Sequence, residues 1–267
     1  MAQEFKFGWL KDLIPPEQKF GRQYGFLPIT RYHAEIDTKK RHSLFELFSN
    51  MPSAYYQGVL SSCTANALLH AFKLRLIAQK YPVEELSRLF LYYEQRIRLN
   101  CVNEDGGSTI YSGVDVLKNS GVCLDRLHQY DCNRFRQRPS TQAYEDAKKR
   151  LVIDCAPVQQ SLKEIKQQLL EGFPIVFGFM VYASFMSDDV KRTGNVPNPH
   201  LGERVLGGHA VMIYGFDDDK NGGSFMCRNS WGMDWGDHGN FYIRYDYVLN
   251  NRMAEDFWAI KNVSEPH

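Results

Sequence analysis

The chain has 267 residues, of which 43% are hydrophobic and 24% charged, and its formal net charge is +1. A chain of this length can form one large domain or two lobes that share a cleft, and its composition excludes the disordered, collagen-like and coiled-coil classes. Because the charges balance and no basic cluster stands out, nucleic acid is not an expected partner.

The first 49 residues are predicted to be an extension and not a domain. They mix charged and aromatic residues with the pair Pro15-Pro16 and show no sustained periodicity, apart from one expected helical turn at residues 43–48. No secretion signal is visible, because no apolar stretch is followed by a small-residue cleavage site. The sequence predicts no particular compartment.

The next part of the chain is predicted to be mostly helical. Apolar residues recur at helical spacing in residues 65–76, and Ser61 or Ser62 can serve as the N-cap. Further helices are expected at residues 83–99 and 113–119. The polar residues 139–150 are expected to cross from one lobe to the other.

The second half is predicted to consist mostly of strands. Ser161 and Glu164 form a capping box for a helix that ends at Gly172. Runs of β-branched and aromatic residues between turn residues then predict strands at residues 173–182, 209–216, 224–229, 240–245 and 256–261. The longest nearly apolar run is shorter than the roughly 20 residues that cross a bilayer, so no membrane span is expected. Helices followed by strands predict an α+β protein with a cleft between two lobes.

Three residues in separate blocks have the side chains that acyl transfer by a cysteine needs. Cys63 lies at the start of a predicted helix, where unpaired amide groups favour an anion, so its thiol pKa is expected to be lowered. Taken alone, a cysteine on an apolar helix is more often a small core residue. Downstream, His209 can take and return a proton, and Asn229 can fix the tautomer of its imidazole.

These residues lie in blocks that resemble the three active-site blocks of the papain-like cysteine peptidases, in the same order and at similar separations: QGVLSSCTANALLHAF, GGHAVMIYGFDD and RNSWGMDWGDHGNFYI. The resemblance implies that Cys63 is the nucleophile, His209 the general base and acid, and Asn229 the residue that orients the imidazole. It also implies that Gln57 completes an oxyanion hole with the backbone amide of Cys63.

With DGGST and the terminal AEDFWAI, the resemblance covers the chain from about Tyr55 to its end. It implies a papain-like peptidase domain at residues 50–267, built from two lobes. The first lobe, at about residues 55–138, should be mostly helical. The second, at about residues 150–267, should be an antiparallel, barrel-like sheet.

The resemblance also indicates residues that contact the substrate. Gly106 and Gly107 match a glycine pair whose backbone hydrogen-bonds an extended peptide, and Gly208 matches another backbone contact. Asp256 aligns with the floor of the S2 pocket, where its carboxylate could accept Arg at P2; the alternative is a surface acid.

Two tryptophans match aromatic residues of the family. Trp231 would shield the hydrogen bond between Asn229 and His209 from water, and Trp235 would form the wall on the leaving-group side. Both are equally well explained as core aromatics.

The cysteine block departs from the best-known members, because Leu60, Ser61 and Thr64 stand where a Cys, a Gly and a Trp are usual. One disulfide half is therefore missing. The block instead resembles a divergent branch found in bacteria, archaea and large viruses. One bridge could still form in the helical lobe, with its pairing left open, among Cys101, Cys123 and Cys132. Cys155 and Cys227 are expected to pack as small hydrophobes.

The leading hypothesis is a cysteine endopeptidase that forms a thioester on Cys63 and needs no metal or organic cofactor. Its partners would be protein or peptide substrates and peptide-like cysteine protease inhibitors. A catalytically silent papain-like binding module is disfavoured because all four catalytic positions are filled. An amidase or transglutaminase also uses Cys and His, but the N-S-W-G block favours a peptidase. A metal-binding protein ranks last, because the Cys and His residues lack ligand spacing.

The N-terminal extension carries a set of apolar side chains too large to leave in water and too small to form a core: Phe5, Phe7, Trp9, Leu10, Leu13 and Ile14. Because a segment of the same chain has a high effective concentration, part of residues 1–36 is predicted to lie across or beside the cleft and to restrain activity. The alternative is a permanent strap on the back of one lobe.

Overall fold

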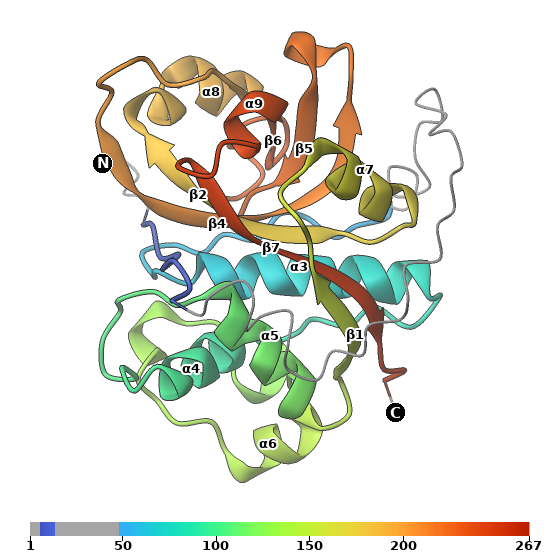
Figure 1. The fold of residues 1–267 in the computed structure, drawn as a ribbon. Coiled ribbons are helices and arrows are strands. Elements are labelled where there is room, and N and C mark those ends of the chain that lie inside the picture. The colour runs from blue at the N-terminus through green and yellow to red at the C-terminus, as the bar shows by residue number, and fades with distance from the viewer. Residues whose placement is uncertain (1–5, 14–47, 267) are drawn as a thin grey trace.

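A computed structural model describes residues 6–13 and 48–266 of the chain (Figure 1). The helical turn predicted at residues 43–48 therefore falls, except for Phe48, outside the described residues. In Figure 1 most of the sheet lies above, a group of helices lies below, and one long helix crosses the middle between them. The α+β prediction with a helical first part and a sheet in the second part is confirmed.

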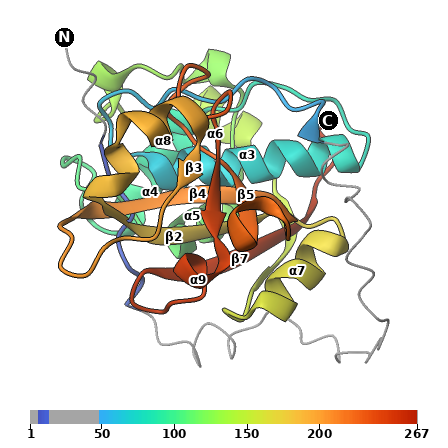
Figure 2. The same cartoon turned by 90° about the horizontal axis from the view of Figure 1, so that it is seen from above.

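The central helix, α3 (Cys63–Ala78), is buried on almost every side from Cys63 to Leu76. Such burial is typical of a helix in the interior of a protein and not on its surface. It packs against β4 and β7 on one side and against α4 and α5 on the other. In the view from above, α3 runs roughly along the direction of β4 (Figure 2). The predicted helix is confirmed, and it separates the two lobes.

The helical lobe contains three further helices: α4 (Arg88–Arg98), α5 (Ile110–Asn119) and α6 (Thr141–Ala147). Two short 3-10 turns follow α5: η1 (Asp125–Leu127) and η2 (Cys132–Arg134). α4 begins at Arg88 and not at residue 83 as predicted, because the Ser87 side chain caps the helix by accepting from the Phe90 N–H. Residues 139–150, predicted to cross from one lobe to the other, contain α6, which the Ser140 side chain caps; the crossing itself stays a prediction.

Seven strands of the described chain form one sheet in the order β1-β7-β2-β4-β5-β6-β3. They are β1 (Val152–Pro157), β2 (Ile175–Tyr182), β3 (Asn195–Val196), β4 (Val205–Asp217), β5 (Ser224–Arg228), β6 (Asn240–Arg244) and β7 (Ala254–Val263). All neighbours are antiparallel except β3 and β6. The sheet is not closed, since β1 and β3 are its edges, so the barrel-like expectation is wrong.

The five predicted strands are confirmed, whereas β1 and β3 were not predicted. The former lacks an alternating burial pattern, and the latter has two residues. Three more helices flank the sheet: α7 (Leu162–Leu170), α8 (Asp188–Thr193) and α9 (Tyr245–Val248). The Ser161 side chain caps α7 as predicted. None of the helices in these two described stretches has the length and hydropathy to cross a membrane.

The strand register determines where the later active-site blocks lie. His209 on β4 pairs with Phe179 on β2, and Ala210 pairs with Gly178. On the other side, β4 pairs with β5, after which Asn229 follows directly. Because β2, β4 and β5 are neighbours, these blocks meet at the face of the sheet that packs on α3.

Candidate active site

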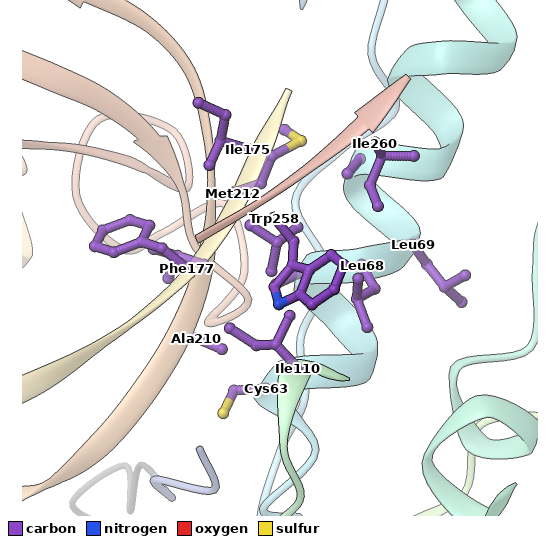
Figure 3. Packing of buried hydrophobic residues seen from close by; sticks show 14 of the residues in the cluster. Cys63, Leu68, Leu69, Ile110, Ile175, Phe177, Ala210, Met212, Trp258 and Ile260 are labelled. Atoms are coloured by element: carbon purple, nitrogen blue, oxygen red, sulfur yellow. The ribbon is translucent and has the colours of Figure 1, made fainter. Parts of the chain in front are cut away.

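Cys63 is the first residue of α3 and is fully buried. Its side chain lies next to Ala210 and Ile110, and its sulfur points away from the core residues Leu68 and Trp258 (Figure 3). Burial raises the pKa of the Cys63 thiol to about 11, although hydrogen bonds from the main chain at Ala210 and Gly8 act in the opposite direction. The expected lowering of this pKa is therefore wrong for the structure as it stands, because desolvation outweighs the helix terminus.

His209 and Asn229 form a buried hydrogen bond of 2.8 Å between Nε2 and Oδ1. The Ser230 N–H also donates to Asn229 Oδ1, at 2.8 Å, which identifies that atom as an acceptor. The proton of the neutral imidazole is therefore on Nε2. His209 Nδ1 is buried and has no hydrogen-bond partner among the described residues. This leaves Nδ1 as the nitrogen able to take a proton.

Burial also lowers the pKa of His209 to about 4, with the Asn229 hydrogen bond acting in the opposite direction. Together with the raised pKa of Cys63, this holds both groups in their neutral forms across the physiological range.

Trp231 covers the His209–Asn229 pair. Its ring stacks on the imidazole with centroids 4.9 Å apart and an interplanar angle of 29°. Trp235 packs edge-on against Trp231 at 5.1 Å and also contacts Phe185 and Phe241. The contacts of Trp231 fit the predicted shield, and Trp235 packs beside it, so that its role as the wall on the leaving-group side stays a prediction.

Gln57 is fully buried beside this group. Its Nε2 donates to the Leu60 carbonyl at 2.8 Å and to the Lys6 carbonyl at 3.3 Å. Its Oε1 accepts from the Ser230 hydroxyl at 2.6 Å. Ser230 thus orients both Asn229 and Gln57, a role that nothing in the sequence had singled out.

Residues 6–13 lie along these residues and pair with them through the main chain. The Trp9 N–H donates to the Gly208 carbonyl at 2.9 Å, and the Leu10 N–H donates to the Ser108 carbonyl at 3.0 Å. The Ser108 N–H donates to the Gly8 carbonyl at 2.8 Å. The extended segment therefore spans from the glycine block of the helical lobe to the histidine block of the sheet.

The glycines on both sides make this close approach geometrically feasible. A methyl group at Gly107 would lie 2.1 Å from the Gly8 carbonyl oxygen, and one at Gly8 would lie 1.9 Å from the Ser61 carbonyl oxygen. Gly106, in contrast, has open space on its α-carbon. Ser108, next to the predicted glycine pair, makes the paired contacts, and the sequence had not indicated it.

Two aromatic side chains of the segment occupy the space between the lobes. The Phe7 ring lies edge-on to His209 at 6.4 Å and to Trp231 at 6.0 Å. The Trp9 indole lies against Gly178, where a methyl group would come within 2.0 Å of the ring. The segment therefore covers the candidate nucleophile and the candidate base.

The Asp256 carboxylate contacts the N-terminal segment at Trp9 and Asp12. Its Oδ2 accepts from Trp9 Nε1 at 3.2 Å and from the Asp12 N–H at 3.1 Å. Its backbone is left-handed, with φ of 59°. An acidic side chain thus contacts an aromatic side chain of the segment that covers the site, and its place in an S2 pocket stays a prediction.

All six cysteines are unpaired, so the bridge considered in the helical lobe is not formed. Cys155 and Cys227 are buried, as expected of small hydrophobes. Residues 6–13 and 48–266 contain no group of three or more His, Cys, Asp and Glu side chains placed to hold a metal ion.

Comparisons with known proteins point to one family. Residues 56–261 match the model described as "Papain family cysteine protease". A peptidase C1-like protein of Acanthamoeba polyphaga mimivirus is 41% identical over 219 residues, which cover 79% of this chain and 70% of the viral protein. A cathepsin B-like cysteine proteinase 3 of Ostertagia ostertagi is 30% identical over 139 residues, covering 52% of this chain and 76% of the relative.

A solved structure extends the similarity to the fold. Xylellain, a cysteine protease from Xylella fastidiosa, superposes with a TM-score of 0.78 at 31% identity, and the match covers 96% of each chain.

Proposed function

The chain belongs to the papain family of cysteine proteases, and from that premise we propose that it hydrolyses peptide bonds through a thioester on Cys63. The observation that carries the proposal is the His209–Asn229 hydrogen bond, which leaves Nδ1 of His209 available for a proton. An Ala210 hydrogen bond at the Cys63 sulfur brings the neighbour of His209 to the thiol.

The proposed reaction begins when the cleft is open to water. Solvation then removes the cost of charge on both groups, so Nδ1 of His209 takes the thiol proton and Cys63 attacks the peptide carbonyl. Gln57 Nε2 and the Cys63 N–H would stabilise the oxyanion; the bond from Nε2 to the Lys6 carbonyl supports this, since it is a donor that faces the cleft. His209 then protonates the leaving amine, and water hydrolyses the thioester with His209 as base.

Residues 6–13 would act as a latch on this site. A main-chain hydrogen bond from Gly8 reaches the Cys63 sulfur, so the segment lies directly beside the candidate nucleophile. The segment would therefore block the access of a substrate to Cys63. The closeness of Gly8 and the pairing of Trp9 with Gly208 support this function over a strap behind one lobe.

Asp256 would select the substrate side chain at P2. An indole N–H already donates to this carboxylate, and the small Gly178 leaves room for a large side chain. A long side chain with an N–H donor, such as Arg or Trp, would fit the same contacts at P2.

Labelling and product analysis test the proposal. The full chain is incubated with an epoxysuccinyl inhibitor, and the adduct is mapped by mass spectrometry. We expect the label on Cys63 and its loss in Cys63→Ala, while the control Cys101→Ala, which removes another unpaired cysteine, is labelled normally. Hydrolysed fragments of a peptide library distinguish a peptidase from a transglutaminase, which would join an added amine. Labelling without turnover would favour the silent binding module.

A further inference from the structure

The two donors of the proposed oxyanion hole belong to different chain segments. The Gln57 side chain precedes α3, and the Cys63 N–H begins it, with residues 58–61 forming a loop between them. Leu60 in this loop stands where the resemblance expects a disulfide-bonded cysteine, and every cysteine of the chain is unpaired. Something other than a covalent bridge must therefore fix the distance between the two donors.

A directed chain of hydrogen bonds joins the two segments. The Tyr130 hydroxyl donates to the Gln57 carbonyl at 2.8 Å and lies 2.6 Å from the Ser62 hydroxyl, which can donate to it in turn. Asn66 Nδ2 donates to the Ser62 hydroxyl oxygen at 3.0 Å and to its carbonyl at 2.9 Å. Arg88 Nη1 donates to Asn66 Oδ1 at 3.0 Å. Each donor polarises the next one, and the chain starts at a permanent cation.

Arg88 also holds the Tyr130 ring in place. Its guanidinium lies over the ring of Tyr130 at 3.8 Å and over the ring of Tyr55 at 4.4 Å. It donates a further bond to the Tyr56 carbonyl at 3.2 Å, directly before Gln57. These contacts compensate an unfavourable position, because Arg88 is the first residue of α4 and a cation at a helix N-terminus opposes the macrodipole.

Two other members of the chain of hydrogen bonds lie at the start of α3. Ser62 occupies the N-cap position of α3, yet its side chain makes no capping bond to that helix. Asn66 is fully buried within α3, although asparagine is a poor helix former. Asn66 Nδ2 bonds to Ser62 within α3, and the Ser62 hydroxyl continues the chain of hydrogen bonds to Tyr130. The first turn of α3 is thereby linked to Tyr130 and, through it, to the Gln57 carbonyl.

We propose that Arg88, Asn66, Ser62 and Tyr130 are positioning residues that hold the two oxyanion donors at the correct separation in place of a disulfide. This inference rests on the proposed function, because it assigns a role to residues that do not touch the substrate. Oxyanion donors act at 2.7–3.1 Å from the developing charge, so a small shift of the Gln57 segment weakens them. This relay of Arg88, Asn66, Ser62 and Tyr130 therefore contributes more to the stabilisation of the transition state than to substrate binding.

Tyr130→Phe tests the proposal by removing one hydroxyl and keeping the ring. In the full chain, and in parallel in the full chain carrying Gly8→Ala, we expect kcat to fall by roughly 10- to 100-fold with KM within about twofold. The matched control is Tyr144→Phe, whose hydroxyl donates to Glu94 at 2.7 Å in the helical lobe, and it should leave both constants unchanged. Arg88→Lys keeps the charge but loses the planar stack, and it should lower kcat as well.

A double-mutant cycle decides whether the loss passes through Gln57. In a Gln57→Ala background, Tyr130→Phe should cost less than about threefold, because the donor it positions is gone. An equal loss in both backgrounds, or an unchanged kcat in both Tyr130→Phe and Arg88→Lys, would overturn the relay while leaving the peptidase intact. If neither the wild-type chain nor Gly8→Ala shows turnover or inhibitor labelling, the proposed function is overturned, and the relay with it.

Discussion

Gly8→Ala is the smallest change that tests whether residues 6–13 restrain the enzyme. The added methyl group would lie 1.9 Å from the Ser61 carbonyl oxygen and 2.4 Å from its carbonyl carbon. These are main-chain atoms next to the start of α3, so they cannot move aside as a flexible side chain could. The segment itself must therefore leave.

The expected size of the effect follows from the bonds that this move breaks. Three main-chain hydrogen bonds tie the segment to the cleft, made by the N–H groups of Trp9, Leu10 and Ser108. At about 1 kcal/mol each, they contribute about 3 kcal/mol, which corresponds to roughly a hundredfold change in the fraction of open molecules. We therefore expect kcat/KM on a short fluorogenic peptide, and the rate of Cys63 labelling, to rise by up to about this factor.

Leu13→Ala is the control, because Leu13 belongs to the same segment but is 93% exposed. It should leave both rates unchanged, and thermal melting should show that both variants are folded. If Gly8→Ala is folded and its activity and labelling rate equal those of the wild type, the segment does not restrain the enzyme. Reduced yield and melting temperature without a gain in activity would instead favour the strap.

Four further outcomes follow from the structure. Cys63→Ala and His209→Ala should each reduce peptide hydrolysis to near background, whereas Asn229→Ala should cost less, since it loosens only the imidazole; equal kcat/KM in Cys63→Ala and wild type would refute the enzymatic role. Acid should open the latch: burial holds the His209 pKa at about 4, below its usual 6.5, so the covered state is fully stable above about pH 6.5 and loses up to about 3 kcal/mol as the pH falls toward 4. Labelling rates of the wild type and Gly8→Ala should therefore converge between these pH values, and a constant ratio would contradict the linkage. Asp256→Ala should lower the ratio of P2-Arg to P2-Leu cleavage, and an unchanged ratio would show that Asp256 does not face P2. Thiol reductants should activate the enzyme by keeping the Cys63 thiol free. Because all six cysteines are unpaired, the reductants should not lower the melting temperature, and a fall of more than about 15 °C would reveal structural bridges.

Local sequence signals account for most of the secondary structure. Ser161 caps α7 through the Glu164 N–H, and the aromatic and β-branched runs became β2, β4, β5, β6 and β7. These signals depend on neighbours within a few residues, so they can be recognised without knowledge of the tertiary structure. The errors lie where tertiary packing decides, as in the two-residue β3, which forms only by pairing with β6.

The sequence also indicated the chemistry of the site, because acyl transfer needs particular side chains in a particular order. Cys63, His209, Asn229 and Gln57 were named from three blocks, and the family was named with them. The sequence did not indicate the raised pKa of the Cys63 thiol. Burial, to which the distant residues 6–13 contribute, raises this pKa more than the helix terminus lowers it, and the prediction relied on the helix terminus alone.

Only the tertiary structure decided how the site is covered and held. Tyr130 and Gln57 are 73 positions apart, and Ser230 and Gln57 are 173 apart, yet each pair shares a hydrogen bond. No local pattern encodes such pairs, because a hydroxyl reads as polar wherever it stands until the fold supplies its partner. The sequence determined which groups can react. Folding determined the distances between the reactive groups, their solvation and the place of residues 6–13 between the two lobes. These three properties decide when the reactive groups can react.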